Sequence, residues 1–346
     1  MPKEITHILL GDEMLKGLPT ATRRALEENR NIYYFGTMSP DLFYYDVKLP
    51  LERVPSAEVF AEHIHGRNGE SNMDHVYLML ERASSTNEGD RFFAFIAGYL
   101  SHVAADTFFH PMIYSITGNY YADSALDRKL AQCRHRVFES SLDLYLLEKA
   151  GKELQAFDMP GKLKLPSDFE EKLILFFAEA LRETFNPEFP LQPAAFRALR
   201  KSRVLQKLMV SRSAYRFFER INRIASHRYD FFLNLFYPPE RAQLDFETRR
   251  TTPHPVSGKP YSRNTQFLIN QSLKRGGLFI RAAWAYYKGK ISRSQVAREI
   301  PPLSLNNGIK RMPVSRMLHY QILPGIESFR DQIGLAKAGV ARHMQS

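Results

Sequence analysis

The sequence predicts an all-α protein: a helical bundle with a multinuclear metal cleft, followed by a basic helical C-terminal region. Apolar residues recur at three- and four-residue spacing over most of the chain. Alternating strand-like runs bounded by turn residues are scarce. The apolar stretch GYLSHVAADTFFHP, residues 98–111, places His102, Asp106 and His110 four residues apart. In a helix, this spacing puts three polar side chains on one face.

The spacing places the expected helices in order along the chain. In the first half they cover residues 4–18, 73–84, 89–116 and 124–151. In the second half helical stretches are expected over 169–186, 195–236, 261–288 and 313–335. Turn-forming residues predict loops at 39–56, 65–72, 156–168 and 249–264. The loop at 156–168 is the best boundary, so we expect one region over residues 1–157 and a second over 158–346.

Composition limits the classes of protein that fit. The 346 residues are 44% hydrophobic and 25% charged, which is typical of a globular chain, and no apolar run predicts a transmembrane segment. The opening MPKEITHILLGDEM has no signal-peptide pattern, so we expect the cytoplasm. A single cysteine, Cys133, excludes an internal disulfide and a Cys-rich zinc site. Any bound metal must therefore be held by His, Asp and Glu.

Charge is distributed unevenly along the chain. Residues 1–150 carry 15 Lys and Arg against 21 Asp and Glu, whereas residues 151–346 carry 33 against 16. Such asymmetry indicates either an anionic partner or a basic surface that faces its own acidic neighbour. The stretches 228–243 and 279–293 mix aromatic with basic residues. They fit either transient contact with a membrane surface or amphipathic helices packed on their own domain.

A second helix repeats the polar spacing of the first. His135 and Glu139 are four residues apart, and Asp143 follows one turn later. Nitrogen and carboxylate ligands of this kind suit Zn²⁺. Either pair alone is more often a core or surface feature than a metal site. Together they favour a metal, because Asp106 is flanked by alanine and phenylalanine and a buried carboxylate needs a strong partner.

These residues carry a family resemblance. HVAADTFFHP followed by HRVFE resembles the zinc-dependent phospholipase C family, which shares its helical fold with zinc-dependent single-strand nucleases. THILLGDEML, FGTMSPDLFYYD and EHIHGRNGE extend the resemblance over roughly residues 1–150. It implies two to three Zn²⁺ ions in a cleft among helices, with a phosphodiester bound across them.

The resemblance also implies a role for individual residues. His65, His102 and Asp106 would hold one zinc, and Asp106 would bridge to a second that also takes His7. A further zinc would be held by His110, His135 and Glu139.

The remaining positions of this scheme are Asp41, the histidine chosen between His63 and His65, and the group that completes the site at His7. Asp41 would orient or activate the attacking water, although residues alone leave it equally a turn aspartate after Pro40. His63 competes with His65, which is preferred because HGRNGE matches the family run. Secreted members complete the site at His7 with an amino-terminal Trp; the single tryptophan here is Trp284, and a processed Pro2 amine is the candidate replacement.

The ligand set itself indicates the chemistry. Paired metal ions polarise a phosphoryl oxygen and activate water, which hydrolyses phosphodiesters. We therefore expect a metal-dependent hydrolase of a phosphate ester, and the resemblance of HVAADTFFHP and HGRNGE to the phospholipase C family implies a phospholipid as the preferred substrate class. A zinc-dependent nuclease is the alternative that the basic second half favours, although nucleic acid is the less favoured partner. A non-catalytic binding protein stapled by metal is the alternative outside enzymes.

Overall fold

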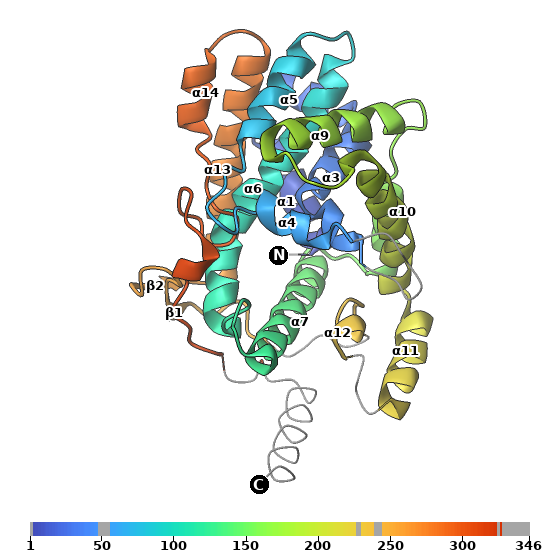
Figure 1. The fold of residues 1–346 in the computed structure, drawn as a ribbon, viewed down its shortest axis with the longest axis vertical. Helices are drawn as coiled ribbons and strands as arrows, with labels where there is room; N and C mark the ends of the chain where they lie inside the picture. Colours follow the sequence, from blue (N-terminus) through green and yellow to red (C-terminus); the bar gives the residue numbers. More distant parts are fainter. Residues whose placement is uncertain (1–2, 48–55, 226–229, 239–243, 324–325, 327–346) are drawn as a thin grey trace.

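Helices make up most of the molecule, and the described residues add one small two-stranded sheet, so the predicted all-α class is confirmed (Figure 1). The computed structural model describes residues 3–47, 56–225, 230–238, 244–323 and 326. The first half contains the α-helices α1 (Glu4–Lys16), α2 (Thr20–Glu27), α3 (Arg30–Gly36), α4 (Glu58–Ile64), α5 (Asp74–Ser84), α6 (Gly89–Thr117) and α7 (Ala125–Lys149). The second half contains α8 (Met159–Lys162), α9 (Glu170–Phe185), α10 (Leu191–Met209), α11 (Arg212–Ile224), α12 (Asp230–Leu233), α13 (Thr265–Tyr287) and α14 (Arg293–Glu299).

The long helix α6 lies at the centre of the bundle. Helices α1, α2, α3, α5, α7 and α13 all pack against it. Apart from the polar stripe of His102, Asp106 and His110 it is largely apolar, and it is buried all round. Among the described helices it alone is long and apolar enough to cross a membrane, yet 94% of its apolar window is buried by the rest of the protein. Burial in the core of the bundle accounts for the apolar composition of α6.

Two glycines allow α3 and α6 to cross in backbone contact. A Cβ atom on Gly98 would lie 2.0 Å from the Tyr33 carbonyl oxygen, and one on Gly36 would lie 2.2 Å from that of Phe95. Neither position has room for a side chain. This close crossing sets the end of α3 directly beside the middle of α6, where His102 lies.

The second half shares the core of the first. Helix α13 lies along α6 and α1, with Leu268, Phe279, Ile280 and Ala283 buried. The stretch 279–293 therefore begins on a packed helix, which favours an amphipathic helix packed on its own domain over contact with a membrane surface. In the other stretch, 228–243, residues 228–229 and 239–243 lie outside the described residues. One apolar cluster runs through both halves. The division at 157 and 158 stays a prediction.

Several expected boundaries in the second half were wrong. Residues 249–264 form a hairpin of β1 (Arg250–Pro253) and β2 (Pro260–Arg263), paired antiparallel, so α13 begins only at Thr265, after the Asn264 cap. The stretch 195–236 is interrupted after Met209 and after Ile224. The described part of 313–335 holds one 3-10 turn, η3 (Val314–Arg316), and 156–168 holds the turn η2 (Gln155–Phe157) and α8.

Candidate metal centre

The eight predicted site residues come together in the interior, and all are buried. They fall into three groups whose possible ligand atoms lie within 4.8 Å of one another. The groups are His7, His102 and Asp106; Asp41, His65 and His102; and His110, His135 and Glu139. The sequence separation between them is large, but α1, α6 and α7 pack side by side and bring them together.

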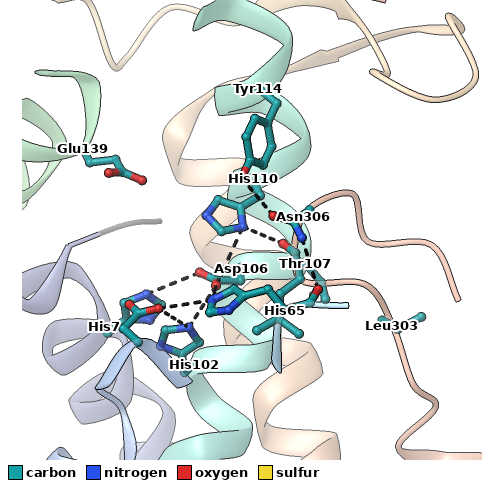
Figure 2. Close-up of polar contacts among 12 residues, drawn as sticks. His7, His65, His102, Asp106, Thr107, His110, Tyr114, Glu139, Leu303 and Asn306 are labelled. Atoms are coloured by element: carbon teal, nitrogen blue, oxygen red, sulfur yellow. Dashed lines mark hydrogen bonds and ion pairs between the residues drawn. The ribbon is translucent and has the colours of Figure 1, made fainter. Parts of the chain in front are cut away.

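Asp106 lies at the centre of the polar stripe on α6. One of its oxygens, Oδ2, is 2.9 Å from His102 Nε2 and 3.8 Å from both His65 Nε2 and His110 Nδ1. The other, Oδ1, is 3.4 Å from His7 Nε2 (Figure 2). The His7 ring stacks on the His102 ring with 3.9 Å between centroids. Asp106 thus faces different histidines with its two oxygens, as a bridging carboxylate does.

Three of the histidines are oriented by main-chain carbonyl groups. The Nδ1 atoms of His65, His102 and His110 lie 2.7, 2.8 and 2.6 Å from the carbonyl oxygens of Ala61, Thr37 and Leu305. A carbonyl oxygen only accepts hydrogen bonds, so each Nδ1 carries the proton and donates it. The lone pair on each Nε2 is then directed at the cluster, which is the arrangement found around metal-binding histidines.

The cluster leaves many buried polar atoms without a hydrogen bond among the described residues. They are both ring nitrogens of His7, the Nε2 atoms of His65, His102 and His110, Oδ1 of Asp41 and both carboxylate oxygens of Asp106. Buried polar atoms are normally satisfied, because leaving them unpaired costs about 1–3 kcal/mol each. Nitrogen and carboxylate donors converging in this way fit Zn²⁺.

The ionisation of most of these groups suits metal binding as well; the exception is His102, where burial acts to lower the pKa but Asp106 and Asp41 outweigh it and raise that pKa. Burial lowers the pKa of His7, and it lowers the pKa of His110 and His135 well below the ordinary value, so these rings are neutral at pH 7. Burial acts to raise the pKa of Asp106, but His102 and His110 outweigh it and hold that pKa well below its usual range. Neutral imidazole and ionised carboxylate are the forms that ligate a metal.

Comparison with known proteins agrees with this geometry. A family model described as zinc dependent phospholipase C matches residues 6–186, which is more than half of the chain. The chain belongs to the zinc-dependent phospholipase C family. This membership supports a zinc-dependent hydrolase acting on phospholipid in general. No curated protein and no solved structure matches the chain.

The resemblance seen in the sequence is therefore confirmed, and the match runs beyond residue 150, through α9. His7, on α1, lies with His102 and Asp106 as the family scheme implies. The amine of Pro2, which the scheme needs as a further ligand, lies outside the described residues. The roles of the individual residues as ligands stay predictions.

Asp41 lies in the 3-10 helix η1 (Ser39–Tyr45), directly after Pro40. Its Oδ1 is 3.2 Å from His65 Nε2 and 3.8 Å from His102 Nε2. It shares a group with those two histidines and also lines the adjoining cleft. This position suits a carboxylate that acts on a water beside the ions.

A cleft of about 960 Å³, counted to its open mouth, adjoins the cluster. Asp41, His135 and Glu139 line its inner end. Tyr44, Tyr45, Tyr114 and Tyr120 form aromatic walls, with Val47, Leu205, Met209 and Leu235 as apolar neighbours. Within residues 43–46 (FYYD), Tyr44 and Tyr45 thus face the cleft and Phe43 lies in the core. The aromatic residues of NIYYFG, residues 31–36, also lie in the core.

Three other polar residues near the predicted site lie outside the cluster. His63 is partly exposed and its Nδ1 is 2.7 Å from Glu70 Oε1, so His65 is the histidine that enters the cluster. His75 is fully buried and its Nε2 is 2.8 Å from the Tyr99 hydroxyl. Asp143 accepts the backbone N–H groups of Ile5 and Thr6, at 3.1 and 2.9 Å. Asp143 therefore anchors the start of α1 and positions His7.

One part of the site was missed by sequence reasoning. The Leu305 carbonyl accepts from His110, and the Leu305 N–H donates to the His65 carbonyl at 3.1 Å. Asn306 Nδ2 donates to the same carbonyl at 3.2 Å, and its Oδ1 accepts from the Tyr114 hydroxyl at 2.9 Å (Figure 2). Gly308 (φ +72°) lets this turn approach α6: a Cβ there would lie 2.5 Å from the Thr107 carbonyl oxygen. The Asn-Asn-Gly run signals a turn, but nothing in it signals which residues the turn contacts.

Proposed function

We propose that this chain is a zinc-dependent phosphodiesterase that cleaves a phospholipid in the phospholipase C sense, releasing a phosphorylated head group, and that it works in the cytoplasm. The observation that carries the proposal is the cluster of buried nitrogen and oxygen donors, grouped at metal-binding distances, that adjoins an aromatic cleft. Family membership supports zinc as the metal and a phospholipid-type substrate.

The residues present would hold two to three ions. His7, His102 and Asp106 form one group; His65 and His102, with Asp41 beside them, form a second; and His110, His135 and Glu139 form a third. When bound, zinc would supply Lewis-acid activation of the phosphoryl group and of water.

The residues of the chain would divide the remaining work. Asp41 would accept a proton from the attacking water, since its Oδ1 has no hydrogen bond and it lines the cleft. The water oxygen would bond to phosphorus as the bond from phosphorus to the glycerol oxygen breaks, and the glycerol oxygen would take up the proton that Asp41 accepted from the water. The carbonyl groups that hold the three Nδ1 atoms keep the rings fixed throughout.

The walls of the cleft suit a lipid head group better than a nucleic-acid strand. Tyrosine faces contact a quaternary ammonium group favourably, and the apolar side chains suit the start of an acyl chain. Along the described cleft the cations are Lys3 and Arg136, against Glu4, Asp41, Glu62 and Glu139. A nuclease needs a groove of cations that tracks successive phosphates. The basic charge of the second half does not line this cleft.

The test is hydrolysis of a short-chain phosphatidylcholine and of single-stranded RNA by the same preparation. We expect release of phosphorylcholine, loss of activity on chelation and recovery with Zn²⁺, with Glu139→Ala as the inactive blank. His63→Ala is the matched control, because it removes a histidine two residues from the site. Cleavage of RNA alone would make the chain a nuclease, and cleavage of neither substrate would make it a metal-stapled binding protein.

A further inference from the structure

Helix α11 carries an apolar stripe that nothing in the described part of the chain covers. Phe217, Ile221 and Ile224 are 60%, 39% and 86% exposed. Their spacing of four and three residues places them on one face of the helix. Isolated exposed apolar residues are ordinary, but three in line on one helix mark an interaction surface.

A basic stripe runs directly beside the apolar one. Arg216, Arg220 and Arg223 each precede one of the three apolar residues, so they repeat the same spacing on the neighbouring face. All three are exposed, as is Arg212 at the start of the helix. The acid on α11 is Glu219, whose carboxylate is 4.0 Å from Arg223. The outer surface of α11 is therefore both apolar and strongly cationic.

The packing of α11 on its own protein uses one side of its apolar face. Tyr215 and Phe218 point inward and cluster with Leu208, Leu233 and Phe236. The apolar face of α11 is broad, and the core covers only the side of it that carries Tyr215 and Phe218. Phe217, Ile221 and Ile224 lie on the remaining side, and no packing within the described part of the chain covers them.

The same segment borders the cleft. Met209, three residues before α11, and Leu235, shortly after α12, both line it. The Tyr237 N–H donates to the Met209 carbonyl at 3.0 Å, which ties the two sides of this segment together. Leu235 also packs on the cluster beneath α11. The inner side of α11 thus packs, through this cluster, on a residue of the cleft wall.

We infer that α11 docks the protein on an anionic phospholipid surface. The arginine stripe would contact lipid phosphates while Phe217, Ile221 and Ile224 enter the boundary between head groups and acyl chains. A nucleic acid would match the arginines but would leave the apolar stripe in water. Docking itself is independent of the proposed function; the further step, that docking presents the cleft to lipid, rests on it.

Co-sedimentation tests the docking directly. The wild-type chain is mixed with vesicles of phosphatidylcholine alone, or of phosphatidylcholine and phosphatidylserine at about seven to three. We expect binding to the anionic vesicles only, weakening as salt rises. F217S/I221S/I224S should abolish it, and R216E/R220E/R223E should weaken it by roughly 100-fold or more, since each basic residue near such a surface contributes about fivefold.

The matched controls are Leu278→Ser and Arg298→Glu, exposed residues of α13 and α14, which lie at the far end of the molecule from α11 (Figure 1). They should bind anionic vesicles as wild type does, and all variants should melt at the wild-type temperature. Wild-type protein that ignores anionic vesicles, or α11 variants that bind them normally, would overturn the inference. So would binding to single-stranded RNA that competes with the vesicles and survives in the apolar variant.

Activity separates this inference from the proposed function. Both α11 variants should hydrolyse monomeric short-chain phosphatidylcholine as fast as wild type and lose activity on anionic vesicles. Vesicle binding without hydrolysis of either substrate leaves docking supported and the proposed function wrong. Hydrolysis of the monomer with no vesicle binding would support the proposed function and overturn docking.

Discussion

The two halves of the chain contribute to the site in different ways. The first half supplies all eight side chains of the metal cluster and carries an excess of acidic residues. The second half supplies none of them and is strongly basic. It nevertheless covers α6 with α13, closes one wall of the cleft with α10, and holds two site histidines through Leu305 and Asn306.

The comparison shows that ligand identity and ligand orientation are encoded in different places. Metal-binding side chains must be of a few chemical types at a few spacings, so they form motifs that a sequence displays. A backbone carbonyl that orients His110 can belong to almost any residue. The family match ends at residue 186, although the turn at 303–308 is part of the same site.

The largest effect is expected from the residue on which the first half depends most. Asp106→Ala should remove more than one zinc per chain, because each oxygen of this carboxylate faces a different histidine. Glu139→Ala should remove about one, because Glu139 belongs to a single group. Elemental analysis of protein purified without a nickel column measures both. Wild-type protein should contain two to three zinc ions.

His63→Ala controls this series, since His63 lies on α4, two residues before His65, but pairs with Glu70 outside the cluster. Its zinc content should equal that of the wild type. Equal zinc in Asp106→Ala and Glu139→Ala would show that Asp106 does not bridge. Removal of all zinc from the wild-type chain should also lower its melting temperature, because a metal bound only by the folded state stabilises it.

The next effect concerns the carboxylate that we assign to chemistry and not to metal binding. Asp41→Asn keeps the shape of the side chain but cannot accept a proton, so turnover should fall by about 10²–10⁴-fold. Zinc content should stay at the wild-type value. Loss of one zinc from this variant would instead make Asp41 a ligand of the group that contains His65 and His102.

The third effect tests the hold of the second half on the first. Asn306→Ala removes a hydrogen bond to the His65 carbonyl and the acceptor of the Tyr114 hydroxyl. Loss of such outer contacts typically lowers metal affinity by about 10–100-fold. Competition with a chelator measures the affinity, and the visible spectrum of the cobalt-substituted protein reports the altered geometry. Asn270→Ala, an exposed residue of α13, is the control. Unchanged affinity and spectrum would show that Asn306 does not orient the metal ligands and that the second half contributes packing alone.

The sequence predicted the helical class and the two ligand stripes, because helical spacing and ligand chemistry are local properties. That His7, His65 and Asp41 join those stripes was implied only by the family resemblance. The four-residue spacing alone was enough to place His102, Asp106 and His110 correctly on one face of α6. The sequence did not predict the hairpin at 250–263 or the contacts of Leu305, since both depend on which distant segments pack together. Asp143 was placed on the ligand stripe, and only the packing of α1 on α7 shows that it caps a helix instead.

The smallest effect is expected at His75, a core histidine of the first half that lies outside the metal cluster. Burial lowers the pKa of His75 from 6.5 to about 3. Below pH 6.5 the unfolded chain therefore binds a proton at His75 that the folded chain does not, and stability falls as pH falls. The contribution is at most about 1.4 kcal/mol per pH unit until the folded pKa is reached. His75→Asn removes this titration, so the unfolding free energy of the zinc-free variant should fall less steeply between pH 6.5 and pH 4. Urea unfolding of both proteins at several pH values measures the difference in slope, and the site histidines, common to both, cancel. Parallel slopes would mean that the buried His75 takes up its proton without unfolding.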